Sequence, residues 1–161
     1  MRAQLAAEVQ AHAALGRAIA ARNLHVTAVF LGAVPAERVE RVRESAQSAQ
    51  KLTLGGKFIL HLERIEFWRR SNLICLTAEH APPQLLSIVD ALRAGLRERG
   101  FELRDHETFR PHVTLVRDVA RGPAAAGVAP VQWPVESFAL IESQVGQRGS
   151  EYTLLDEWPL T

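Results

Sequence analysis

RPHVTLVRD at residues 110–118 has the alternating apolar pattern of a β-strand, and it carries a histidine and a threonine two positions apart. The same order, His-Val-Thr, occurs in NLHVTAVFLG at residues 23–32. Side chains alternate between the two faces of a strand, so the histidine and threonine of each segment share one face. Two matched pairs in one chain predict two imidazoles and two hydroxyls that converge on a single site.

The residues around the two pairs indicate where they face. The valine between His25 and Thr27, and the one between His112 and Thr114, are apolar and can pack into a core. The polar pairs must then face elsewhere, and a buried imidazole without a partner costs free energy. A shared polar cleft accounts for both pairs. Either histidine alone would also fit a structural strand residue bonded to the backbone.

Length and charge restrict the class of protein. A chain of 161 residues fits one domain with a substantial core. A formal net charge of +1 argues against a strongly basic nucleic-acid coat but allows a local basic cleft. Cys75 stands alone within the apolar run SNLICLTAE, so we expect a buried small side chain and no intramolecular disulfide.

The start of the chain and its hydropathy predict the compartment. MRAQLAAEVQ is amphipathic and lacks the apolar core of a signal peptide. No run of about 18 apolar residues is present, so we expect no membrane span. The sequence therefore predicts a cytoplasmic protein without a membrane partner. We also expect it to be a monomer.

Hydrophobic periodicity predicts alternating helices and strands. We expect helices over 2–21, 35–51 and 83–99, strands over 24–31, 58–62, 65–67, 73–77, 113–116, 135–143 and 152–155, and a surface loop over 120–130. Short connections favour one α+β or α/β domain. Because both halves hold a His-Val-Thr strand followed by further elements, we expect a pseudo-symmetric fold with two lobes.

Two imidazoles and two hydroxyls suit chemistry at phosphorus. One neutral imidazole can accept a proton while a charged one donates a proton, which permits in-line displacement. Threonine hydroxyls can donate hydrogen bonds to the non-bridging phosphate oxygens. Neither His-Val-Thr triplet contains Asp, Glu or Cys, and two histidines without a third ligand make a poor zinc site. We therefore expect no metal and no cofactor.

The repeated H-h-T-h pattern, where h is hydrophobic, resembles the signature of the two-histidine phosphoesterase superfamily. The closer resemblance is to its RNA 2',3'-cyclic phosphodiesterase branch, also called 2'-5' RNA ligase, and covers about residues 23–160. It rests on NLHVTAVFLG followed by Pro35 and a helix, on the middle stretch ERIEFWRRSNLICL, on FRPHVTLVR, and on the tail ESQVGQRGSEYTLLDEWPL.

The resemblance implies a bilobal α+β fold in which antiparallel sheets line a central cleft and helices lie outside. It implies hydrolysis of RNA 2',3'-cyclic phosphate ends to 2'-phosphomonoesters. Some members of the family also join or split 2'-5' linkages in tRNA halves without ATP. The expected partners are therefore RNA ends or nucleoside cyclic phosphates.

The resemblance also implies a role for each matched residue. His25 would protonate the departing 3'-oxygen, and His112 would act as general base on water. Thr27 and Thr114 would hold the phosphate oxygens. Arg117 matches a family arginine that assists phosphate binding, although it would also fit a solvated charge at a strand end.

One departure from the family concerns the start of the chain. Family members usually begin with a short strand before the first helix, whereas Met1-Arg2 leads almost directly into an Ala-rich helix. Either the chain lacks that strand or its start is truncated, and an absent strand would leave a sheet edge unpaired. We expect residues 1–161 to form a single two-lobed domain.

Two other functions fit the same motifs. One is a module that binds nucleotides or RNA ends with little turnover. The other is a phosphoesterase for ADP-ribose cyclic phosphate or 2'-5' oligoadenylate.

Three further residues have open roles. Arg110 can lend positive potential, and His106 either lines the cleft or is solvated. Trp68 with Arg69-Arg70 fits a base-stacking patch or the packed end of a hairpin.

Overall fold

The computed structural model describes residues 1–52, 56–103, 108–146 and 149–161. In chain order the elements are α1 (Arg2–His12), the 3-10 turn η1 (Ala13–Leu15), β1 (Arg17–Ala18), η2 (Ala21–Asn23), η3 (Ala36–Arg38), α2 (Val39–Leu52), β2 (Phe58–Trp68), β3 (Leu73–Thr77), α3 (Pro83–Glu98), β4 (His112–Arg117), β5 (Ala126–Val135), β6 (Ser137–Gly146) and β7 (Gly149–Pro159).

The chain divides into two compact units. The first comprises Met1–Thr27, Ile59–Ala81 and Arg110–Trp133, and the second comprises Ala28–Phe58, Pro82–Phe109 and Pro134–Thr161. Each unit has an antiparallel sheet and at least one helix, which confirms the predicted α+β class. Both His-Val-Thr segments belong to the first unit.

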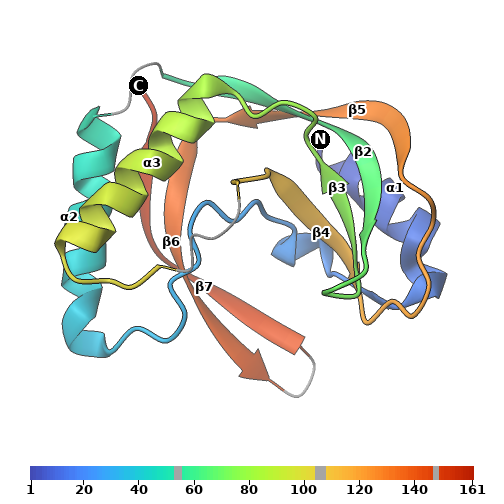
Figure 1. Ribbon diagram of the computed structural model, residues 1–161, viewed down its shortest axis with the longest axis horizontal. Coiled ribbons are helices and arrows are strands. Elements are labelled where there is room, and N and C mark those ends of the chain that lie inside the picture. The colour runs from blue at the N-terminus through green and yellow to red at the C-terminus, as the bar shows by residue number, and fades with distance from the viewer. Residues whose placement is uncertain (53–55, 104–107, 147–148) are drawn as a thin grey trace. The chain divides into compact units, whose positions relative to one another are not determined.

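The first unit is built on a five-stranded sheet in the order β1-β4-β3-β2-β5. Val113 and Leu115 of β4 are buried, as are Leu5 and Val9 of α1, which contacts this strand. Figure 1 shows the sheet curling, with α1 against its outer side. The alternate residues of β4 therefore face the inner side of the curl.

The first helix is shorter than the predicted span of 2–21. α1 ends at His12, and after η1 the chain becomes extended at Gly16 to enter β1. A Cβ atom on Gly16 would collide with the carbonyl oxygen of Arg117. This close approach to β4 ends the helical segment and lets Arg17 pair with Arg117.

The predicted strand over 24–31 is also wrong for most of its length. Val26 forms an isolated antiparallel bridge with Val113, and no continuous strand follows it in the described residues 27–31. The physical reason is the path of the chain, which leaves the first unit after Thr27. One residue pair can form before the segment departs from the edge of β4.

The predicted surface loop over 120–130 contains the start of a strand. β5 begins at Ala126 and pairs with β2 at the edge of the sheet. Pro130 and Pro134 obscure this strand in the sequence, but an edge strand tolerates proline because one side of its backbone has no ladder partner.

The second unit packs α2 against α3 and contains the two-stranded β6-β7 sheet. Small buried side chains on α2, Ser45, Ala46 and Ala49, allow close contact with α3 near Gly95. As predicted, α3 ends just before Gly100, whose φ of +77° suits glycine at a helix C-terminus.

Candidate functional site

The bridge between Val26 and Val113 brings the two predicted motifs together on one sheet edge. In this antiparallel register, His25 lies opposite Thr114 and Thr27 lies opposite His112. Directly opposed residues have Cβ atoms roughly 4.5–5.5 Å apart. The two histidines and two threonines therefore form one group of four side chains in which each histidine lies opposite a threonine. All four lie on the face opposite the bridging valines.

Both imidazoles are held in the same way. His25 Nδ1 donates to the carbonyl oxygen of Asn23 over 2.7 Å, and His112 Nδ1 donates to that of Arg110 over 2.8 Å. A carbonyl can only accept a hydrogen bond, so each Nδ1 carries the proton. In a neutral ring the lone pair then lies on Nε2, which is the nitrogen available for proton exchange.

The two histidines differ in their surroundings. His25 is exposed, whereas His112 is half-buried and its ring centroid lies 4.4 Å from that of Trp68. Burial lowers the pKa of His112, and the positive charges of His25 and Arg110 lower it further, against the opposing effect of the backbone hydrogen bond. His112 is thus neutral near pH 7, as a proton acceptor requires.

The two threonines also differ. Thr27 is exposed, and Thr114 is half-buried with its hydroxyl oxygen 4.0 Å from the sulfur of Cys75. Cys75 is fully buried, as predicted, and burial raises the pKa of its thiol to about 12. Cys75 therefore remains a thiol that packs beneath Thr114 and does not provide a nucleophile.

A β-bulge determines where Arg117 faces. Adjacent residues of β3 pair with Thr114 and Val116, so Leu115 is an extra residue in β4. Leu115 and Val116 are consecutive yet both fully buried. The alternation of faces therefore restarts after the bulge, and Arg117 returns to the face of Thr114. Consistent with this placement, the charge of Arg117 lowers the pKa of the Cys75 thiol, against the larger effect of burial.

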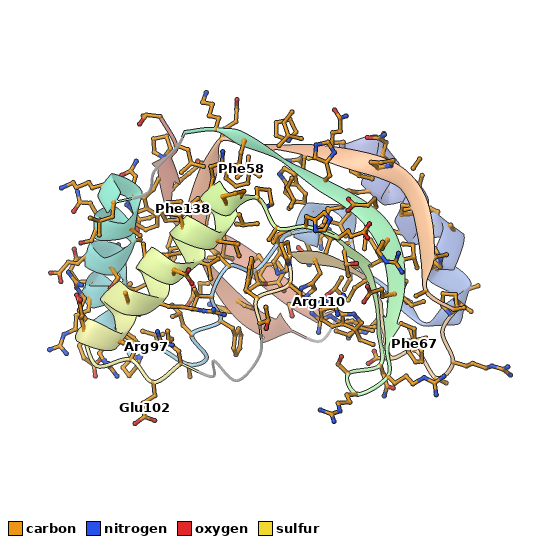
Figure 2. All side chains as sticks on the ribbon, turned by 45° about the horizontal axis from the view of Figure 1, so that its top comes forward. Phe58, Phe67, Arg97, Glu102, Arg110 and Phe138 are labelled. Atoms are coloured by element: carbon orange, nitrogen blue, oxygen red, sulfur yellow. The ribbon has the colours of Figure 1, made fainter. Side chains whose placement is uncertain are left out.

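A carboxylate that the sequence analysis did not single out lies in the same polar face. Glu66 of β2 accepts hydrogen bonds from Arg110 and Trp68, the two residues in contact with His112. Figure 2 labels Arg110, whose side chain lies on the inner side of the curled sheet. Because side chains alternate along β2, Glu66 and Trp68 lie on one face. This two-residue spacing is the sequence signal that could have identified Glu66.

The remaining predictions concern metals, membranes and His106. Among the residues that the structure describes, no three His, Cys, Asp or Glu side chains gather where they could hold a metal ion. None of the helices in the described part of the chain has the length and apolar character needed to cross a membrane. His106 lies outside the described residues.

The sequence matches a known family and its curated members. The 2'-5' RNA ligase superfamily matches residues 2–147. The RNA 2',3'-cyclic phosphodiesterase of Escherichia coli is 33% identical over 152 residues, which cover 91% of this chain and 81% of that protein. The protein of the same name from Thermus thermophilus is 28% identical over 145 residues, which cover 86% of this chain and 72% of that protein.

Solved structures agree with this match. Escherichia coli LigT in complex with 3'-AMP superposes with a TM-score of 0.86 at 29% identity, covering 99% of this chain and 91% of that one. A phosphoesterase crystal structure gives 0.85 at 27% identity, covering 100% and 93%. These likenesses confirm the predicted phosphoesterase fold.

Proposed function

Because the chain belongs to the 2'-5' RNA ligase superfamily, we propose that it hydrolyses the 2',3'-cyclic phosphate at RNA ends to a 2'-phosphomonoester. The observation that carries the proposal is the bridge between Val26 and Val113, which sets two imidazoles and two hydroxyls on one face. Binding alone would not require two imidazoles that can give and take protons.

In the proposed reaction, water attacks phosphorus in line with the bond to the 3'-oxygen. Nε2 of His112 takes a proton from the water as the new P–O bond forms. His25 gives a proton to the 3'-oxygen as the P–O3' bond breaks. The products are a free 3'-hydroxyl and a 2'-phosphate, and the two imidazoles have exchanged their protonation states.

The neighbouring side chains stabilise the negative charge that develops on the phosphoryl oxygens. Thr27 and Thr114 donate hydrogen bonds to the non-bridging oxygens, and Arg117 adds a guanidinium on the same face. Proton transfer and charge stabilisation are thus supplied by side chains, so the scheme uses neither a metal ion nor a cofactor.

The same groups support ligation when a 5'-hydroxyl replaces water. Attack of that hydroxyl on the cyclic phosphate forms a 2'-5' phosphodiester and releases the 3'-oxygen, with His112 and His25 in unchanged roles. A relative has been crystallised with 3'-AMP and with ATP, and this supports RNA ends and nucleoside cyclic phosphates as ligands here. We expect the chain to act as a monomer.

Product analysis on a short RNA that ends in a 2',3'-cyclic phosphate tests the proposal. The reaction is run in EDTA and the product is identified by its sensitivity to enzymes that act on 2'- or 3'-phosphates. We expect a 2'-phosphate. A 3'-phosphate would contradict the assigned leaving group, and tight binding of a 2'-nucleotide without turnover would favour a binding module instead.

A further inference from the structure

We propose that Glu66 is a positioning residue that holds His112, the general base of the proposed function, through its two neighbours Arg110 and Trp68. Glu66 itself does not reach the reacting atoms in this scheme. It acts by fixing the groups on either side of the imidazole.

The first contact runs through Arg110. Nη2 of Arg110 donates to both carboxylate oxygens of Glu66, over 2.8 Å and 2.9 Å. The carbonyl oxygen of the same Arg110 accepts the proton on His112 Nδ1. An ion pair that anchors the Arg110 side chain therefore restrains the backbone group that selects the tautomer of His112.

The second contact runs through Trp68. Its indole Nε1 donates to Oε2 of Glu66 over 3.0 Å, and its ring lies against His112 at an interplanar angle of 52°. The guanidinium of Arg110 lies 5.6 Å from the Trp68 ring centroid. Glu66, Arg110, His112 and Trp68 thus form a closed circuit of contacts in which Glu66 and His112 each touch both Arg110 and Trp68.

The Glu66 carboxylate is mostly buried and contacts a neighbouring strand of the sheet. Only 17% of the Glu66 side chain is exposed, and the Thr77 hydroxyl of β3 lies 3.3 Å from Oε1. Burial raises the pKa of Glu66, but hydrogen bonds from Trp68, Arg110 and Thr77 together with the charge of Arg110 outweigh it, so the net pKa is lowered. A mostly buried carboxylate is costly unless it is fully bonded, and here its donors hold it ionised.

Glu66 also balances charge near His112. The charged groups that act on this imidazole are His25 from the bridging segment and Arg110 from the approach to β4, and uncharged Thr77 of β3 pairs with His112. Glu66 of β2 is paired with that Arg110 and also lies 3.9 Å from Arg64. Arg110 disfavours the imidazolium form, and the neighbouring carboxylate offsets that charge. Loss of the Glu66 charge should therefore lower the pKa of His112 further.

The first test follows His112 directly by NMR titration of the imidazole in the free protein. In Glu66→Gln, we expect a lower pKa for His112 with the Nδ1–H tautomer retained. In Glu66→Ala, we expect mixed tautomers. Glu63→Gln is the matched control, because Glu63 lies on the same strand but accepts from the backbone of Glu79 and not from Arg110 or Trp68.

The second test separates kcat from KM on the cyclic phosphate. We expect Glu66→Ala to lower kcat roughly 10- to 100-fold with little change in KM, as for a misplaced catalytic group. Trp68→Phe keeps a ring beside His112 but removes the indole donor, so its loss should be smaller. In a double-mutant cycle, Glu66→Ala should lower kcat by a smaller factor once Arg110→Ala is present, and the remaining loss should run through Trp68.

The outcomes distinguish the two proposals. If the wild-type chain fails to hydrolyse cyclic phosphate ends, the proposed function is wrong, while the NMR titration still tests the role of Glu66. If Glu66→Gln and Glu66→Ala leave both the His112 titration and kcat as in Glu63→Gln, the positioning role is overturned and the proposed function stands.

Discussion

His25 and His112 each donate from Nδ1 to the carbonyl oxygen of the residue two positions earlier, although their surroundings differ in burial. Each His-Val-Thr segment thus provides the same backbone acceptor for its histidine, and the valine bridge joins the two segments. This hydrogen bond gives both rings the same tautomer and leaves the same nitrogen for chemistry.

Asparagine substitution separates that structural bond from proton transfer. An asparagine amide can donate in place of Nδ1 but has no equivalent of Nε2. We expect His25→Asn and His112→Asn each to lower kcat by roughly 10²–10⁴-fold, the usual contribution of general acid–base catalysis. Urea unfolding should show wild-type stability within about 1 kcal/mol. Substantial activity in either variant would refute the assigned roles.

As the pH is lowered, the hydrolytic activity should fall only at pH values below the usual pKa of a histidine. Burial lowers the pKa of His112 from its ordinary value of 6.5, so the base stays unprotonated to lower pH. We expect the acid limb of kcat/KM to lie below pH 6.5. A limb above that value would contradict the environment described for His112.

The same shift predicts how stability depends on pH. Because the folded-state pKa of His112 lies below the unfolded value, the unfolded chain binds more protons between these two values. The free energy of unfolding should therefore decrease as pH falls from 6.5 through that window. His112→Asn should reduce the slope, as measured by urea unfolding at several pH values, while His12→Asn serves as a control outside the site.

Arg117 should contribute to phosphate binding. We expect Arg117→Gln to lower kcat/KM roughly 100-fold, in line with the loss of one group that stabilises transition-state charge. Arg117→Lys should recover only part of the activity, since lysine lacks the bidentate fork. Arg2→Gln removes an equal charge from exposed α1 and should leave kcat/KM unchanged. If Arg117→Gln and Arg2→Gln lowered kcat/KM equally, Arg117 would act only through the net charge of the protein and not by contact with the phosphate.

Gly16 should be required for the pairing of β1 with β4. A methyl group there would collide with the Arg117 carbonyl oxygen, so Gly16→Ala should lower the free energy of unfolding by about 1–3 kcal/mol, as overpacking does. Gly127→Ala is the control, because its nearest neighbour, the Glu63 carbonyl oxygen, is 3.9 Å away. Equal stability of both variants in urea unfolding would contradict the described contact.

Local sequence patterns predicted the elements whose determinants are local. The strand over 73–77 and the end of α3 before Gly100 match the structure, because a short apolar run and a glycine with positive φ act within a few residues. The strand over 24–31 and the loop over 120–130 did not match. Their conformations depend on the path of the chain between units and on the partner strand β2.

The sequence by itself determined that His112 and Thr114 share a face, since side chains alternate along the strand β4 that it predicted. For His25 and Thr27, whose segment is not a continuous strand, the tertiary structure supplied the pairing of Val26 with Val113. Only the tertiary structure decided the position of Arg117. Uninterrupted alternation would have turned it to the buried side with Val113, and the extra residue in β4 returns it to the site. Only the tertiary structure brought Glu66 to Arg110, a neighbour of His112, because that contact requires β2, β3 and β4 to pair in register.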